Sequence, residues 1–260
     1  MQVTPPRWSD LAVRVEELRL AIGFLTRLPV SATEEIPAGA LARAGWAFPV
    51  VGTVIGLLGA IGYSLAATLG LPPLAAALLA LAVTVGLSGA LHEDGLADSA
   101  DGLFGGADRA QRLAIMRDSR SGAYGVLALI FSIGLRAAAL AALGDPGRVA
   151  AALVAAHAVA RGGLPLVLRA LDPARDDGLG AAAGRPDAGL AWGAAAVGAV
   201  IALIALGLGA AVALALAAAA MALVAGLARR KIGGYTGDIL GTVEQAGEIV
   251  VLLAASAWVS

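Results

Sequence analysis

The chain has 260 residues, of which 59% are hydrophobic and 14% charged, and its mean hydropathy is +0.85. Soluble domains are typically about 45–50% apolar and about 25% charged, so this composition excludes a water-soluble protein and a disordered chain. The net charge of −1 argues against a nucleic-acid partner, and the absence of cysteine excludes a disulfide scaffold and thiolate chemistry.

Residues 1–45 predict a cytoplasmic N-terminal segment with one amphipathic helix. Its apolar residues recur at helical spacing, and its charged residues are expected on the opposite face. The apolar residues are Leu11, Val15, Leu18, Ile22 and Leu25, and the charged residues are Arg14, Glu16, Glu17 and Arg19. The pattern fits a helix in the membrane interface or one lying on the membrane domain's own surface.

Seven apolar runs follow, and they predict an all-α, polytopic membrane bundle over residues 46–260. About 20 apolar residues in a helix cross the hydrocarbon core of a bilayer. The runs are 46–69, 74–91, 123–143, 149–168, 190–208, 210–228 and 239–259. The last run is the weakest, because Glu244 and Glu248 lie in its first half.

The polar regions between these runs predict the orientation. If the spans alternate, residues 1–45, 92–122, 170–189 and 229–238 share one face, and with Arg169 they hold fifteen of the eighteen basic residues. Basic residues accumulate on the cytoplasmic side of a membrane. We therefore expect a multi-pass protein of a bacterial plasma (inner) membrane whose active site faces the cytoplasm.

Three basic side chains lie inside predicted spans: Arg136, His157 and Arg161. A charge at the bilayer centre costs at least about 2.5–3.5 kcal/mol on insertion scales, so each arginine needs a partner or a wet cavity. The nearest acids in depth are Glu244 and Glu248, which predicts ion pairs with Arg136 or Arg161. A cavity that admits part of a substrate is the alternative.

Residues 92–122 form an acidic and then basic segment, which carries the predicted chemistry. If the preceding helix continues, Asp94, Asp98 and Asp101 share one face at i, i+4 and i+7. No lysine relieves their repulsion, so we expect a divalent cation such as Mg²⁺ there, with a solvated acidic loop as the alternative.

Four arginines follow the carboxylates, and metal plus arginine suits phosphoryl transfer. They are Arg109, Arg112, Arg117 and Arg120. Taken singly, each fits a membrane anchor or a lipid-headgroup contact better. The nearby glycines do not form a P-loop, and we interpret them as turns or as points of close backbone approach to a nucleotide. These glycines are Gly95, Gly102, Gly105 and Gly106.

The motifs of this segment closely resemble those of the cobalamin synthase family, adenosylcobinamide-GDP ribazoletransferase. They are Glu93-Asp94-Gly95-Leu96-Ala97-Asp98, Asp101-Gly102 and Arg117-Asp118-Ser119-Arg120-Ser121-Gly122. Flanking matches occur at residues 24–29, 46–52 and 237–248, so the resemblance covers nearly the whole chain.

The resemblance implies a Mg²⁺-dependent reaction of adenosylcobinamide-GDP with α-ribazole or its 5′-phosphate, which yields adenosylcobalamin or its phosphate and GMP. It implies metal ligands at Glu93, Asp94, Asp98, Asp101 and Asp238, with Asp94, Asp98 and Asp101 catalytic. Asp101 is the expected base for the 5′-hydroxyl proton. Substrate-binding roles are expected for Arg27, Arg109, Arg117, Ser119 and Arg120.

Two other function classes remain open at the level of sequence. CDP-alcohol phosphotransferases also use helical aspartates, but their motif continues differently after its Asp-Gly pair. A transporter would also carry acids and arginines, but here the acids concentrate in loops and no inverted repeat is evident. Expected partners are the small-molecule substrates, membrane lipid and, as an open alternative, a second copy of the chain.

Overall fold

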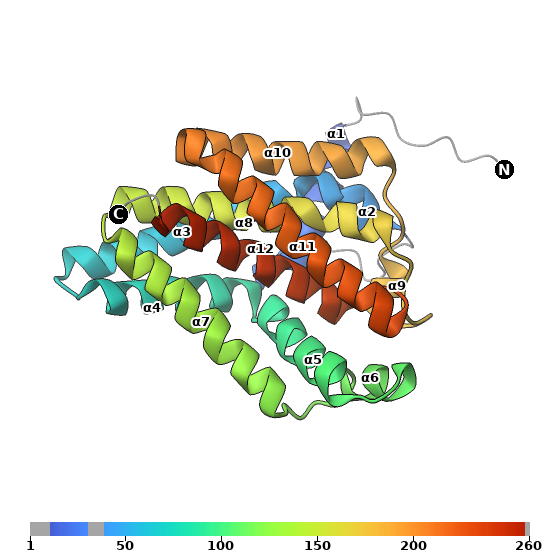
Figure 1. Ribbon diagram of the computed structural model, residues 1–260. Coiled ribbons are helices and arrows are strands. Elements are labelled where there is room, and N and C mark those ends of the chain that lie inside the picture. The colour runs from blue at the N-terminus through green and yellow to red at the C-terminus, as the bar shows by residue number, and fades with distance from the viewer. Residues whose placement is uncertain (1–10, 31–38, 258–260) are drawn as a thin grey trace.

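The structure is a computed structural model that describes residues 11–30 and 39–257, and within these ranges it is built of helices (Figure 1). The predicted end of the seventh apolar run, at residues 258–259, lies outside the described residues. In chain order the elements are α1 (Leu11–Leu25), α2 (Ala40–Ala44), η1 (Gly45–Ala47), α3 (Phe48–Thr68), α4 (Pro73–Ser88), α5 (Leu91–Gly105), α6 (Arg109–Ile115), α7 (Ala123–Leu143), α8 (Pro146–Ala170), α9 (Gly178–Ala182), α10 (Ala188–Leu206), η2 (Gly207–Gly209), α11 (Ala210–Ile232) and α12 (Gly237–Ala257).

The seven predicted apolar runs correspond to α3, α4, α7, α8, α10, α11 and α12. By length and hydropathy, the described residues provide five candidate membrane spans, or six if the bent pair α4 and α5 forms one span. The stretch Ala188–Ile232, which contains both α10 and α11, is counted as one of these five candidate spans. The all-helical, multi-pass membrane fold is therefore confirmed, but the predicted number of seven spans is not.

Helix α8 lies at the centre of the bundle. It packs against α3, α10 and α12, and most of its residues are buried. Alanine is the most frequent of its buried residues, and such small side chains let neighbouring helices approach closely in a membrane protein. Because α8 is enclosed, its polar residues His157 and Arg161 must find partners inside the protein.

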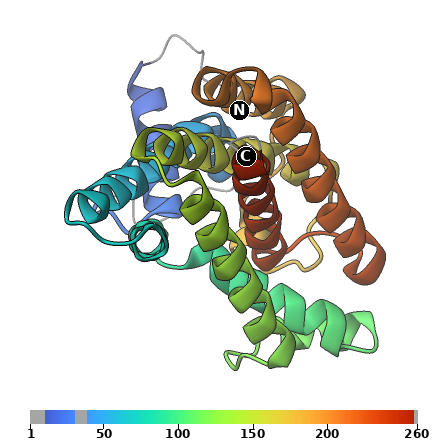
Figure 2. The ribbon, with the colours of Figure 1, turned by 60° about the vertical axis from the view of Figure 1, so that its left-hand side comes forward.

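The chain turns sharply between α4 and α5, so the helix of the second apolar run does not continue straight into the acidic segment, which forms a separate helix. Gly89 and Ala90 both adopt left-handed backbone conformations, with φ values of 64° and 58°, and the two helices meet at 90°. A left-handed residue ends an α-helix, and glycine adopts that conformation without a Cβ penalty. Figure 2 shows α4 nearly end-on and α5 leading away from it. The break directs the acidic helix along α12 and α7.

Helix α1 packs on α2 and α3, so the structure supports the predicted alternative of a helix on the domain's own surface. One expectation was wrong: Glu17 lies on the buried face together with Ala21 and Leu25. Its carboxylate accepts hydrogen bonds from Trp46 Nε1 at 2.8 Å and from Arg14 Nη1 at 2.6 Å. Both donors bond Oε2, and they offset part of the cost of burying the carboxylate.

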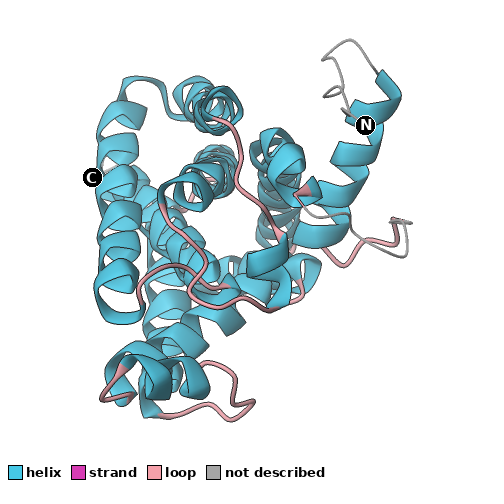
Figure 3. Ribbon diagram, turned by 90° about the vertical axis from the view of Figure 1, so that its right-hand side faces the viewer, coloured by secondary structure: helices cyan, strands magenta, loops and turns pink. Residues whose placement is uncertain are grey.

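The polar regions predicted to share one face do meet at one end of the bundle. Arg117 reaches Asp177, Arg109 reaches the carbonyl of Ile232, and the backbone N–H of Gly39 donates to Ala182. Figure 3 looks at this end, where connecting loops cross between the helices. The candidate active site lies here.

Candidate active site

Three of the five predicted metal ligands come together where α5 crosses the start of α12. Asp98 lies close enough to Asp94 and Asp238 for their negative charges to repel its own, and Asp94 repels Asp238 in the same way. Asp94 is exposed and Asp98 is partly buried. No described side chain donates a hydrogen bond to either of them, so this site presents carboxylate oxygens that are available to a cation or a proton.

Gly95 makes this crossing possible. A Cβ at this position would lie 2.9 Å from the carbonyl oxygen of Asp238 and 3.0 Å from its Cα. Real Cβ atoms do not approach backbone atoms so closely, so any side chain would push α5 away from α12. The glycine after Asp94 therefore serves helix packing, and because it lies inside α5 its interpretation as a turn is wrong.

We expect Gly95→Ala to reduce turnover strongly, because separating the helices moves Asp94 and Asp98 away from Asp238. Overpacking of this kind costs about 1–3 kcal/mol, so thermal stability should also fall. Gly86→Ala is the matched control, because a Cβ at this α4 position meets nothing within 4 Å. Equal activity of the two variants in a turnover assay would contradict the packing role.

Arg175 is the main site residue that sequence reasoning missed as a candidate. Its Nη2 lies 3.0 Å from Asp238 Oδ2, and Thr236 Oγ1 donates to the same oxygen at 3.0 Å. The signal in the sequence is an arginine flanked by acids and glycine at residues 172–178, a pattern similar to that of the main acidic segment. Arg175 places a positive charge beside the carboxylate cluster.

A short backbone pairing holds Arg175 in place. Pro173 and Tyr235 form a parallel β-bridge, in which Ala174 N–H donates to Tyr235 O at 2.7 Å and Tyr235 N–H donates to Asp172 O at 2.9 Å. The segment before α9 is thereby joined to the segment before α12, which carries Asp238. The two charged residues are fixed relative to each other by the backbone.

Arg109, predicted to bind substrate, is engaged with the backbone instead. Its Nε donates to Ile232 O at 2.8 Å and its Nη2 to Ala174 O at 2.6 Å. A helix C-terminus has unpaired carbonyl groups and a partial negative charge, which suits a guanidinium. Arg109 thus ties the end of α11 to the segment that carries Arg175.

The other predicted substrate-binding residues lie near the protein surface. Arg117 pairs with Asp177, with Nη2 2.5 Å from Oδ1, and its side chain is 54% exposed. Arg120 hydrogen-bonds Asp118 and holds the pKa of that carboxyl at about 2, while Ser119 between them is exposed. Arg27 is exposed, and its side chain lies against Gly89 at the α4–α5 break.

Asp101, the expected base, is buried against the start of α7. One carboxylate oxygen accepts the N–H of Gly122 at 2.6 Å, and the other accepts the N–H of Gly125 at 2.9 Å. These are free N–H groups at a helix N-terminus, which favour a negative charge. The carboxylate thus connects the acidic helix to α7.

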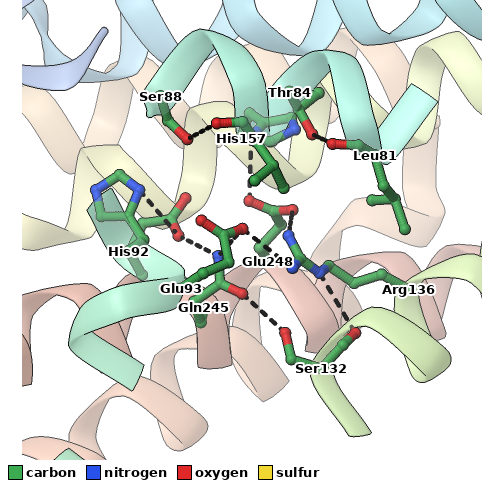
Figure 4. Close-up of polar contacts among 12 residues, drawn as sticks. Leu81, Thr84, Ser88, His92, Glu93, Ser132, Arg136, His157, Gln245 and Glu248 are labelled. Atoms are coloured by element: carbon green, nitrogen blue, oxygen red, sulfur yellow. Dashed lines mark hydrogen bonds and ion pairs between the residues drawn. The ribbon is translucent and has the colours of Figure 1, made fainter. Parts of the chain in front are cut away.

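Glu93 points into the bundle, away from the other predicted ligands. Its Oε1 lies 3.1 Å from Arg136 Nη2 and 3.3 Å from Gln245 Nε2. Arg136 also pairs with Glu248 at 2.8 Å, and Ser132 Oγ donates to Gln245 at 2.8 Å (Figure 4). Glu93 therefore anchors the first turn of α5 to α7 and α12.

The pairing predicted for the intramembrane arginines is confirmed. Arg136 pairs with Glu248, and Arg161 pairs with Glu244 at 2.5 Å and lies 3.8 Å from Glu248. His157 Nδ1 lies 3.1 Å from Glu248, so it is an interior polar residue as expected. Both glutamates and His157 offer ligand atoms within 4.8 Å of one another, but two arginines already balance these acids and repel a cation.

A cavity of about 240 Å³ opens beside the carboxylate cluster. Asp94, Arg175, Asp177 and Asp238 line its polar end. Apolar side chains from α1, α2, α3 and α8 also line it, and among the other lining residues are three with polar groups. The apolar residues are Phe24, Leu41, Phe48, Leu164 and Leu168, and the polar ones are His92, Tyr235 and Thr236. The molecule is thus a helical membrane protein with carboxylates and an arginine at the polar end of an apolar cavity.

Comparison with known proteins gives the family. Residues 17–256 match the cobalamin-5-phosphate synthase family, so the chain belongs to this family. It is a transferase of cobalamin biosynthesis, which decides against the CDP-alcohol phosphotransferase and transporter alternatives.

Several relatives are similar over nearly their whole length, and each is named adenosylcobinamide-GDP ribazoletransferase. The protein from Bradyrhizobium diazoefficiens is 54% identical over 94% of both chains. The protein from Mesorhizobium japonicum is 46% identical over 93% of both, and that from Xanthobacter autotrophicus is 48% identical over 92% of this chain and 94% of its own. No solved structure matches the chain.

Proposed function

We propose that this enzyme transfers the adenosylcobinamide phosphate group of adenosylcobinamide-GDP to a free ribose hydroxyl of α-ribazole or α-ribazole 5′-phosphate, with release of GMP. The expected 5′-hydroxyl cannot be the attacking group, because the 5′ oxygen of the second acceptor already carries a phosphate. The observation that carries the proposal is the meeting of Asp94, Asp98 and Asp238 beside Arg175, at the mouth of a cavity. Phosphoryl transfer requires mainly positioning and charge stabilisation, and these residues are suited to both tasks.

The carboxylate cluster fits Mg²⁺ in its chemistry. Mg²⁺ takes oxygen ligands, usually one or two carboxylates together with substrate phosphate oxygens, and Asp94 and Asp98 have no described side-chain donor. We assign Asp94, Asp98 and Asp238 as the residues that would hold the ion. Bound there, Mg²⁺ would neutralise charge on the diphosphate.

The chain's own residues account for the remaining steps. A free ribose hydroxyl oxygen of the acceptor forms a bond to the β-phosphorus, its proton passes to a carboxylate, and the bond between that phosphorus and the GMP oxygen breaks. Because both oxygens of Asp101 accept backbone hydrogen bonds, Asp94 suits the proton better. Arg175 and Arg117, at or near the cavity mouth, are placed to contact phosphate oxygens.

The proposed location is the inner membrane of a bacterium, with the active site facing the cytoplasm. The polar end of the bundle carries the candidate site and most of the arginines, in the distribution typical of a cytoplasmic face. Exposed apolar residues such as Ile61, Ile130 and Ile204 suit contact with lipid. Assembly with a second copy of the chain stays a prediction.

The direct test uses purified protein with adenosylcobinamide-GDP, α-ribazole and Mg²⁺, followed by product chromatography. We expect cobalamin and GMP in equal amounts, and loss of both when EDTA removes the metal, with recovery after Mg²⁺ is added back. Folded protein that gives neither product would contradict the proposal. Full activity in EDTA would contradict its metal requirement alone.

A further inference from the structure

The cavity beside the carboxylates has two chemically different ends. Asp94, Asp238 and Arg175 form the polar end, where the proposed reaction takes place. The opposite end is apolar, and its walls include Leu41, Phe48 and Leu164, which are each at most 3% exposed. A ligand that fills the cavity must therefore be apolar at one end and carry its reacting group at the other.

The size of the cavity restricts the occupant to a small group. Its volume of about 240 Å³ lies below the roughly 300–1,000 Å³ of pockets that enclose a drug-sized ligand. A corrinoid macrocycle does not fit in such a space, so the cobinamide portion of the donor must lie outside it. A single nucleoside is closer to the right size.

The chemistry of the walls favours one kind of base. The rings of Phe24 and Phe48 stack with centroids 6.1 Å apart and an interplanar angle of 25°, which makes an aromatic wall. Among the described lining residues, the nearby hydroxyl groups are already engaged: Tyr235 donates to Gly180 O, and Thr236 donates to Asp238. The buried His92 also lines the cavity and can meet one polar atom of a base. A guanine base presents several donors and acceptors and would leave most of them unpaired, whereas an alkylated benzimidazole has a single acceptor nitrogen.

We infer that this cavity is the acceptor subsite, in which the apolar end holds the benzimidazole base of α-ribazole and the polar end receives its reacting ribose hydroxyl beside Asp94. The inference rests on the proposed function, because it assigns one of the two substrates to a place. It also requires the nucleotide of the donor to bind on the cytoplasmic side of the carboxylates, where Arg117 lies. The two substrates then meet at the carboxylate cluster from opposite sides.

The test fills the apolar end of the cavity with a larger side chain and measures the KM of each substrate separately. Leu168 lines the cavity from α8, whereas Leu166 on the same helix is partly exposed and is not among the lining residues. We expect Leu168→Trp to raise the KM for α-ribazole at least about tenfold and to leave the KM for adenosylcobinamide-GDP within about twofold. Leu166→Trp should change neither KM. Size-exclusion chromatography reports whether each variant is folded, and Leu164→Phe replaces Leu168→Trp if the latter misfolds.

The possible outcomes distinguish a wrong subsite from a wrong proposed function. A rise in the KM for adenosylcobinamide-GDP with no change for α-ribazole would overturn the inference, as would unchanged constants in both Leu168→Trp and Leu164→Phe. Equilibrium dialysis of labelled α-ribazole against the wild-type protein, without the second substrate, adds a readout independent of turnover. Saturable binding that Leu168→Trp weakens, in a preparation that forms no cobalamin, would support the subsite and contradict the proposed function. Product formation without saturable binding of α-ribazole, and without a KM shift in Leu168→Trp, would support the proposed function and contradict the subsite.

Discussion

Asp94→Asn is expected to lower kcat by at least about 10²–10³-fold, the size of effect seen when one charge-stabilising group is removed from an active site. Asparagine keeps the size of the side chain and removes its negative charge, so it can neither hold a divalent cation well nor accept the proton. Asp94 is exposed and no described side chain donates to it, so the fold should be unaffected. The measurement is turnover at saturating substrates, with insertion checked by membrane fractionation.

Asp98→Asn should have a similar effect, and Asp172→Asn is the matched control. The Asp172 side chain is 81% exposed at the same end of the bundle, and its structural contact with Tyr235 is made by the backbone, which the substitution retains. We expect it to keep activity within about twofold of the wild type. Near-normal rates in both Asp94→Asn and Asp98→Asn would disprove the metal assignment.

The sequence predicts the apolar helices well because their signal is local. The structure places α7 over Ala123–Leu143, the same bounds as the predicted run at 123–143, and the other helices begin and end within a few residues of their runs. Three bounds differ by three or four residues: α4 ends at Ser88 instead of residue 91, α8 begins at Pro146 instead of residue 149, and α11 continues to Ile232 instead of residue 228. The pairing of Arg136 and Arg161 with Glu244 and Glu248 was also predictable, because these were the nearest acids in depth along the predicted spans. The additional contact of Arg136 with Glu93 was not predicted.

The different roles of the carboxylates on α5 could not be predicted from the sequence. Glu93 and Asp94 are neighbours, but successive side chains on a helix point about 100° apart, so one faces Arg136 and the other faces the cavity. Asp101 has the spacing of a third ligand, but the start of α7 lies over it and supplies two N–H donors. Which face of α5 is covered depends on helices that are distant in sequence.

The position of Arg175 shows the same limit. Its ion pair with Asp238 depends on the β-bridge between Pro173 and Tyr235, a contact across 62 residues that no local pattern indicates. The turn at Gly89 and Ala90 is another case, because alanine rarely adopts a left-handed conformation by its own preference. Tertiary contacts fix both features, and together they build the site.

Arg136→Met is expected to destabilise the folded protein by about 3–5 kcal/mol, the usual cost of removing one partner from a buried ion pair. Arg136 is 1% exposed and pairs with both Glu93 and Glu248. Its loss therefore leaves two buried carboxylates without the positive charge of its guanidinium group. Because Glu93 anchors the first turn of α5, turnover should fall as well. The measurements are the yield of folded protein and the thermal midpoint in detergent.

Arg148→Met is the control for the loss of an arginine, because Arg148 is exposed in the first turn of α8, whereas the cavity-lining Leu164 and Leu168 lie near the other end of that helix. A second comparison tests the pairing itself: Arg136→Glu combined with Glu248→Arg should recover part of the stability that Arg136→Glu alone loses. Recovery should be incomplete, because Glu93 and His157 also contact this pair and would meet changed charges. A double variant no more stable than the single one would contradict a structural ion pair and favour the alternative that Arg136 faces a substrate-filled cavity.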